Sequence, residues 1–198
     1  MEIKEEIIEM LKATERDGIQ EFIESMIENG FFEAPCSGGN HLCKTGGLAE
    51  HSLNVCKAAM KLAIAWNMTD MMDSVVIVSL LHDYGKCGDY GKQLYVDNVL
   101  KSGKVSQAKP FKRNPEILEK NHAVKSVVMI NRWFDLTEQE EYAILHHDGL
   151  YERANYEAMM TPTPLLMILH FADLWSSRVI EKAEFDEMVK PKTKESEE

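Results

Sequence analysis

Two features are missing from the sequence: a hydrophobic run long enough to cross a membrane, and any pair of cysteines in CxxC spacing. The first absence argues against a membrane protein, and the acidic start Met1–Glu6 does not resemble a signal peptide. We therefore expect a cytoplasmic protein whose four cysteines are reduced thiols. A disulfide or a zinc site built from Cys36 and Cys43 is the alternative.

Positive charge is scarce as well. The 198 residues include 22 Lys and Arg against 33 Asp and Glu, and the resulting net charge of −11 disfavours tight nonspecific binding to nucleic acid. Residues 86–113 are the exception, with seven basic and two acidic side chains. A basic segment of this kind attracts phosphate groups. A solvated loop whose lysines maintain solubility is the other interpretation.

Hydrophobic residues make up 44% of the chain, an ordinary share for a globular protein, and the length suits a single domain spanning residues 1–198. Most apolar residues recur every three or four positions, which predicts an all-α fold. The predicted helices cover residues 3–16, 19–29, 48–67, 70–85, 116–133, 138–148 and 161–190. The first two form a helix pair around Gly18 within residues 1–30, and the charged tail 190–198 is expected to fray.

Short local signals mark several helix ends. Asp70 is the predicted N-cap of the fourth helix, and Gly85 is its predicted C-cap. Thr137, with Glu140 three residues on, has the capping-box pattern. The final helix opens with Thr161–Pro164, in which a threonine cap precedes proline in the first turn.

Residues 87–113 predict a short irregular or hairpin insertion in the helical fold. The strand signal lies at Leu94–Val96, and a turn at Gly103 leads to a second extended piece at Lys104–Val105. This insertion coincides with most of the basic segment.

An unusual polar pair ends the most apolar stretch of the chain. Val75–Leu81 is too hydrophobic for a surface, and His82 and Asp83 follow it at once. A buried carboxylate is costly unless a partner compensates its charge. Further histidines and aspartates interrupt other apolar helix faces: His51, His122, His146, His147 and Asp173. Taken singly, each is more typical of a hydrogen-bonded core residue, but one shared metal centre explains them all together.

Histidine and carboxylate donors without cysteine suit divalent Zn, Fe, Mn, Co or Ni, and the residue types do not choose among these metals. The donor set exceeds what one tetrahedral ion takes, so two metal ions are the more economical interpretation, with Asp83 as the bridge. Such a site activates water and holds the oxygens of a displacement at phosphorus. Lys86 is then predicted to hold the substrate phosphate, and Asp83 and Lys86 are the predicted catalytic residues. An ordinary surface lysine is the alternative for Lys86.

These motifs resemble those of the HD-domain metal-dependent phosphohydrolases. His82–Lys86 looks like the HDxGK signature of that family, and Gly46–Ser52 is similar to its GGLxxHS/T segment. The resemblance covers about residues 40–180 and implies an all-α helical bundle with the metals among its helices. It implies His51, His82, Asp83 and Asp173 as ligands of a first metal. For a second metal it implies Asp83 and His122 with one or both of His146 and His147.

Two further similarities concern the subgroup. Asn40–His41 and Thr163–Asp173 resemble the HD domain of a bacterial 3′→5′ exoribonuclease, although the acidic charge and the lack of a separate nucleic-acid-binding domain weaken that resemblance. Asn121–Val127, followed by Leu136–Glu138, resembles small stand-alone HD hydrolases of gut bacteria and phages. His122 and His146–His147 resemble the extra ligands of the HD-GYP cyclic-dinucleotide phosphodiesterases. No GYP triplet follows His146–His147, however, so a cyclic-dinucleotide substrate is not implied.

The leading hypothesis is an enzyme that hydrolyses the phosphate ester of a nucleotide or a similar small molecule. Lys86, Lys125 and His41 are the predicted contacts of the phosphorylated substrate, whereas His170 is expected to pack near Asp173. An exoribonuclease-like phosphodiesterase, a di-iron oxygenase and a non-catalytic regulatory module are the alternatives. Neither the native metal nor the oligomeric state is indicated by the residues.

Overall fold

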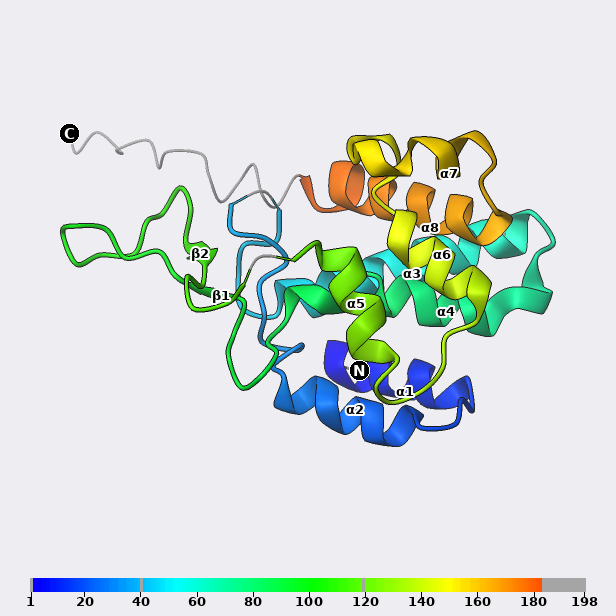
Figure 1. Cartoon of the computed structure of the whole chain (residues 1–198), viewed down its shortest axis with the longest axis horizontal. Helices are drawn as coiled ribbons and strands as arrows, with labels where there is room; N and C mark the ends of the chain where they lie inside the picture. Colours follow the sequence, from blue (N-terminus) through cyan, green and yellow to red (C-terminus); the bar gives the residue numbers. More distant parts are fainter. Residues whose placement is uncertain (1, 40, 119, 183–198) are drawn as a thin grey trace, which may run out of the picture.

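The structure is a computed structural model, and it describes residues 2–39, 41–118 and 120–182. Within them the chain forms an α-helical bundle with one small two-stranded sheet, which confirms the predicted all-α class (Figure 1). The elements are α1 (Ile3–Ala13), α2 (Ile19–Glu28), α3 (Gly47–Ala65), α4 (Met72–Leu81), β1 (Tyr95–Asp97), β2 (Phe111–Arg113), α5 (His122–Ile130), α6 (Glu138–His146), α7 (Tyr156–Met160) and α8 (Pro164–Trp175). None of the described helices combines the length and the apolar character that crossing a membrane requires.

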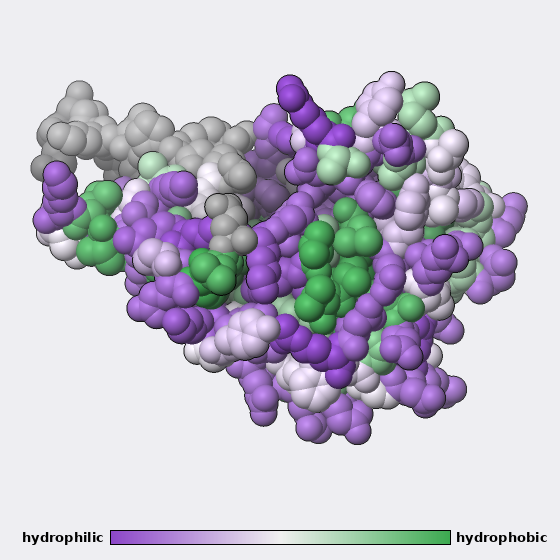
Figure 2. Space-filling view, in the orientation of Figure 1, coloured by the Kyte–Doolittle hydropathy of each residue, from purple (hydrophilic) through white to green (hydrophobic). Residues whose placement is uncertain are grey.

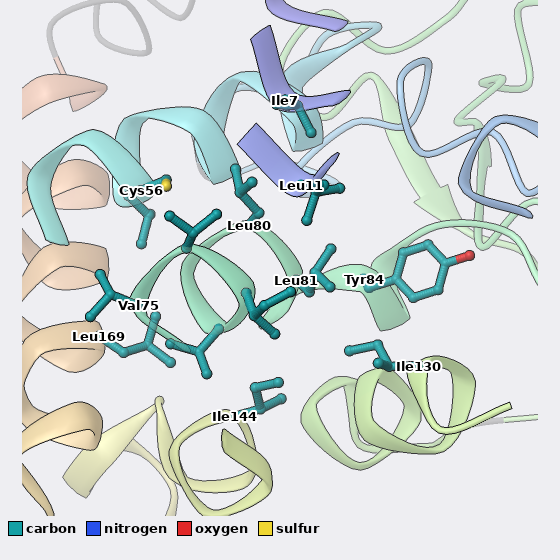
Figure 3. Close-up of a cluster of buried hydrophobic side chains, with 14 of the residues drawn as sticks. Ile7, Leu11, Cys56, Val75, Leu80, Leu81, Tyr84, Ile130, Ile144 and Leu169 are labelled. Carbon is teal, nitrogen blue, oxygen red and sulfur yellow. The ribbon is translucent and has the colours of Figure 1, made fainter. Parts of the chain in front are cut away.

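Helix α4 lies at the centre of the bundle. It is apolar on every side, as expected for a helix without a solvent face, and it packs against α1, α3, α6 and α8. Figure 3 shows Val75, Leu80 and Leu81 of α4 surrounded by side chains of the neighbouring helices, among them Leu169 and Ile144. His82 and Asp83 therefore emerge from the most buried helix of the described residues.

The N-terminal helices α1 and α2 form the predicted pair around Gly18. Gly18 has a φ of +81°, a left-handed conformation that glycine adopts without strain. A Cβ atom at this position would lie 2.2 Å from the carbonyl oxygen of Trp133. The glycine thus provides both the turn between the helices and a close contact with the segment after α5.

The limits predicted for the fourth helix were wrong at both ends. A 3-10 turn, Thr69–Met71, precedes α4, and the side chain of Asp70 makes no capping hydrogen bond. The helix ends at Leu81, and Gly85 belongs to a second 3-10 turn, Tyr84–Lys86. Gly85 is present for another reason, because a Cβ atom there would lie 2.2 Å from the carbonyl oxygen of His122. Because Gly85 has no Cβ atom, α5 packs directly on the turn that follows His82 and Asp83.

The start of α5 also differs from the prediction of a helix over 116–133. The side chain of Asn121 accepts hydrogen bonds from the backbone N–H groups of Ala123 and Val124, so the helix begins at His122. In α6 the predicted capping box of Thr137 is present. Residues 149–160, for which no helix was predicted, form two 3-10 turns, Gly149–Tyr151 and Arg153–Asn155, and the short helix α7.

Thr163 caps α8 as predicted, through a hydrogen bond from the backbone N–H of Leu166. The α-helix ends at Trp175 and continues as one π-helical turn, Ser176–Ile180. The predicted extension of this helix to Lys190 lies largely outside the described residues, and the predicted frayed tail 190–198 lies wholly outside them.

The predicted hairpin insertion is present, but its second strand was misplaced. β1 pairs antiparallel with β2, with Tyr95 opposite Arg113, whereas Val105 makes only an isolated bridge with Val99. Gly103 has a φ of +80° and lies at the predicted turn. The insertion projects from the bundle in Figure 1, and hydrophilic residues predominate on the face that Figure 2 shows.

Candidate metal centre

Six side chains from five helices converge at one place in the bundle. His82 and Asp83 follow the end of α4, and His51 lies in the second turn of α3. The other three come from the start of α5, the end of α6 and α8: His122, His147 and Asp173. The structure thus brings together most of the residues that the sequence predicts as metal ligands.

Asp83 stands between two groups of histidines. Its Oδ2 atom lies 3.6 Å from Nε2 of His51 and 3.5 Å from Nε2 of His82. Its Oδ1 atom lies 3.3 Å from Nε2 of His122 and 3.7 Å from Nε2 of His147. The two oxygens of one carboxylate therefore face two different pairs of nitrogen donors.

Asp173 completes the cluster, with Oδ1 3.2 Å from Nε2 of His51. The donor atoms form overlapping sets whose members all lie within 4.8 Å of one another: His51, His82 and Asp83; Asp83, His122 and His147; His82, His147 and Asp173. Sets of three donors that share members are the arrangement expected where two ions lie close together.

Hydrogen bonds at Nδ1 fix how three of the imidazoles point. Nδ1 of His82 donates to the carbonyl oxygen of Ser79 at 3.0 Å, and Nδ1 of His147 donates to that of Ile144 at 2.7 Å. Nδ1 of His51 lies 3.0 and 3.1 Å from the two carboxylate oxygens of Glu181. A proton on Nδ1 leaves a lone pair on Nε2, which is the tautomer that metal-binding histidines adopt.

Two buried atoms of the cluster have no hydrogen-bond partner among the described residues: Nε2 of His82 and Oδ1 of Asp83. Both side chains are at most 1% exposed, and a buried polar atom without a partner destabilises the fold. Coordination of a cation by these atoms would remove that penalty. Together with the donor types, this shows that the residues fit a divalent transition metal.

The ionisation of the two carboxylates and of His122 suits a metal, whereas Cys36, Asp173 and Glu181 raise the pKa of His51 against the effect of burial, so a metal must displace a proton from this imidazole. Burial opposes ionisation of Asp83, but the ammonium of Lys86, 2.6 Å from Oδ2, and the neighbouring His82 outweigh it and hold the pKa of this carboxyl well below its usual range. Burial likewise opposes ionisation of Asp173, whose pKa the hydrogen bond with His51 nevertheless lowers. Burial lowers the pKa of His122 to about 4. Anionic carboxylates and neutral imidazoles are the forms that bind metal ions.

The family model of the HD domain matches residues 48–176. The chain belongs to the HD-domain family. A search among curated proteins and another among solved structures found no match. The HD-domain family belongs to a superfamily of metal-dependent phosphohydrolases whose members bind divalent metals, and the donor sets around Asp83 could hold such ions.

A cavity of about 280 Å³ lies beside the cluster of donor side chains and is large enough for a small phosphorylated group. Lys86 and His41, two of the predicted substrate contacts, line it together with His51, His147 and Asp173. Nε2 of His41 lies 3.2 Å from the thiol of Cys36, and Cys36, His41 and His51 form a further set of donors. None of the four cysteines, all of which the structure describes, forms a disulfide, so Cys36 and Cys43 are not bridged.

Two predicted site residues lie elsewhere. Nδ1 of His146 is 2.8 Å from the side-chain oxygen of Asn155, and His146 belongs to none of the donor sets found among the described residues. Neighbouring positions on a helix point about 100° apart, so only His147 of this pair faces the cluster. Lys125 is 6% exposed, and its ammonium donates to the carbonyl oxygen of Cys87. It does not line the cavity beside the cluster.

Two carboxylates of the site, those of Glu181 and Asp148, were not predicted from the sequence. Glu181 is buried and accepts from His51 and from the side-chain amide of Asn54. It follows Asp173 by eight residues, a spacing that leaves it about 80° round the helix axis from Asp173, so the spacing alone did not mark it as a site residue. Asp148 lines the cavity, with Oδ2 3.5 Å from Nε2 of His122. It directly follows His147, so its adjacency to a candidate ligand was the available hint.

Proposed function

We propose that this protein is a phosphohydrolase with two metal ions, which hydrolyses the phosphate ester of a nucleotide or a similar small molecule. The observation that carries the proposal is the position of Asp83, whose two oxygens face two separate pairs of histidine nitrogens. When bound, two such metals activate water for attack and stabilise charge on the phosphate oxygens. The HD-domain family supports hydrolysis as the reaction class.

In this proposal each residue of the cluster has a role. His51, His82 and Asp173 would hold one metal with Oδ2 of Asp83. His122 and His147 would hold the other metal with Oδ1 of the same carboxylate. These imidazoles are held in place by the helices that carry them, so the donors are oriented before a metal or a substrate binds.

Lys86 and His41 are the proposed contacts of the substrate. The side chain of Lys86 is 20% exposed and lines the cavity, and Asp83 raises the pKa of its ammonium against the effect of burial. It therefore stays a cation and can attract a phosphate group. Burial lowers the pKa of His41 to about 4, so its imidazole is neutral at neutral pH. In this form it can donate a hydrogen bond to a substrate, or accept one from it, without adding charge to the site.

The proposal is tested by metal content and activity measured on the same preparations. The purified protein is expected to bind two metal ions per chain and to release phosphate or nucleoside products from a broad panel of nucleotides. Asp83→Asn should lose at least one ion and lower kcat by at least a hundredfold. Asp70→Asn, the same change at an exposed aspartate outside the cluster, should alter neither.

A second pair of variants separates the two neighbouring histidines. His147→Gln is expected to reduce the metal content, whereas His146→Gln should leave it unchanged because His146 lies outside the cluster. A fully loaded wild-type protein that hydrolyses nothing across the panel with Mn, Fe, Co, Ni or Zn would contradict the proposed reaction. Oxygen uptake by the iron-loaded protein would instead favour the di-iron oxygenase alternative.

A further inference from the structure

The insertion forms a second cavity beside the proposed active site. This cavity, of about 340 Å³, is lined by Tyr95, Lys109, Lys112 and Arg113, with Ala108, Gly38 and Gly39 completing its wall. None of its described lining residues is acidic, although the chain as a whole carries a net charge of −11. A concentration of cations that runs against the overall charge of a protein marks a place that attracts anions.

Two glycines, Gly38 and Gly39, allow the insertion to pack closely on the loop before α3. A Cβ atom at Gly38 would lie 3.0 Å from the carbonyl oxygen of Phe111, and one at Gly39 would lie 3.1 Å from Cγ of Lys109. These approaches are too close for most side chains, so the pair of glycines lets β2 and Lys109 pack on the backbone of the loop. The basic side chains thus have a defined position relative to the bundle.

The same loop forms a wall of both cavities. Cys36 and His41 lie on the side of the metal cluster, where His41 lines the first cavity. Gly38 and Gly39 line the second cavity. Because Gly39 and His41 are two residues apart, their Cα atoms lie within about 7 Å of each other. The two cavities therefore lie against the same short stretch of the loop.

Tyr95 and Arg113 lie next to each other in the wall of the second cavity. They are directly paired across the β-ribbon, and the guanidinium of Arg113 donates to the carbonyl oxygen of Lys120. Burial raises the pKa of the Tyr95 phenol, on which the charges of Lys86 and Asp83 also act.

We propose that the substrate carries a second phosphate group, which the basic cavity of Lys109, Lys112 and Arg113 binds while the scissile phosphate lies at the metal cluster. This inference rests on the proposed function and specifies its substrate class. Arginine and lysine form charge-assisted hydrogen bonds with phosphate, and two phosphates fixed at two cavities would set the orientation of the ester between them. The cavities favour a bisphosphorylated nucleotide or a short oligonucleotide over a simple monoester.

The test compares adenosine 3′,5′-bisphosphate with adenosine 5′-monophosphate. We expect Lys109→Gln/Lys112→Gln to raise the KM and the Kd for the bisphosphate about tenfold and to leave those for the monophosphate within about twofold. The control is Lys101→Gln/Lys104→Gln, which removes the same charge from exposed positions of the insertion that do not line the cavity. This control should leave both ligands unaffected.

Equal weakening of both ligands, an equal effect of the control variant, or no effect of Lys109→Gln/Lys112→Gln would each overturn the second phosphate site. Equilibrium binding measured by calorimetry keeps this outcome separate from the proposed function, because a protein that hydrolyses neither nucleotide can still show the difference in Kd. A 5′-phosphorylated dinucleotide and a decanucleotide distinguish the sources. Equal affinity for these two supports a small-molecule substrate, and tighter binding of the longer strand supports an oligonucleotide.

Discussion

At the residue scale, the role of Glu181 shows how a residue outside the donor set controls a donor. Its carboxylate is 1% exposed and lies 3.0 Å from Nδ1 of His51, and the amide of Asn54 donates to the same oxygen at 3.1 Å. This contact keeps the proton of His51 on Nδ1 and the lone pair on Nε2. A carboxylate in this position also makes the imidazole a more basic metal ligand.

Glu181→Gln should therefore weaken metal binding without unfolding the protein. The amide keeps the size of the side chain but loses the charge, and it can present an N–H group to Nδ1, which favours the wrong tautomer of His51. We expect the metal dissociation constant to rise about tenfold or more. Metal titration of the apo protein measures it, with the exposed Glu116→Gln as the control. Equal metal affinity of Glu181→Gln and the wild type would exclude this positioning role.

The donors themselves were predictable because each is a polar residue where a helix needs an apolar one. His51, His122 and Asp173 interrupt apolar faces, and that conflict is visible without coordinates. The choice between His146 and His147 was not predictable, because it depends on the rotation of α6 about its axis. The position of the Lys125 side chain was not predictable for a similar reason, since one turn along α5 from His122 its ammonium donates to the carbonyl oxygen of Cys87.

At the element scale, the contact between α5 and the turn after α4 sets the distance between the two halves of the cluster. The hydroxyl of Ser126 accepts from the backbone N–H of Gly85 at 2.8 Å and donates to the carbonyl oxygen of His82 at 2.7 Å. His122 lies one turn before Ser126 on the same helix face. The close approach that Gly85 allows thereby places His122 beside Asp83.

Gly85→Ala is expected to separate these elements. The added carbon would meet the carbonyl oxygen of His122 at 2.2 Å and the backbone nitrogen of Ser126 at 2.9 Å, so α5 must shift. Overpacking of this kind costs about 1–3 kcal/mol, and denaturant unfolding should show a loss in that range together with weaker metal binding. In Gly91→Ala the added carbon meets nothing within 4 Å, so only its φ of +71° adds a cost, and metal binding should be unchanged. Identical metal binding by both variants would rule out the role of the contact.

Element boundaries were predictable where a side chain caps the helix in a recognisable local pattern, as at Thr137 and Thr163. They were missed where the contact that decides them is distant in the chain. Gly85 has the appearance of a helix C-cap, but its partner is the backbone of α5. The pairing of β1 with β2 was missed because 13 residues separate Asp97 from Phe111, and turn signals do not specify a register across such a loop.

At the scale of the whole molecule, a largely buried ion pair joins the turn between α1 and α2 to helix α6 of the bundle. The guanidinium of Arg16 donates to both carboxylate oxygens of Glu140 in α6, at 3.0 and 2.7 Å. The side chain of Glu140 is 0% exposed, and that of Arg16 is 22% exposed. Burial opposes ionisation of Glu140, but Arg16 and the backbone N–H of Thr137 outweigh it and lower the pKa of this carboxyl.

The sign of the resulting pH dependence follows from that direction. A carboxyl whose pKa is lower in the folded than in the unfolded protein stabilises the fold at pH values above its ordinary range, near pH 4.5. This contribution is lost as the pH falls from about 4.5 through the lower pKa of the folded state. The pair therefore stabilises the molecule fully at neutral pH and progressively less in acid.

Arg16→Met should destabilise the protein by about 3 kcal/mol at pH 7, because it leaves the carboxylate of Glu140 buried without its partner. The difference from the wild type should shrink as the pH falls below 4.5, where Glu140 of the variant becomes neutral. Urea unfolding at several pH values measures both effects. Lys57→Met, which removes an exposed pair with Glu6, should cost no more than about 1 kcal/mol. A loss in Arg16→Met that stays constant down to pH 3 would show that packing of the arginine stem, and not its charge, joins the helix pair to α6.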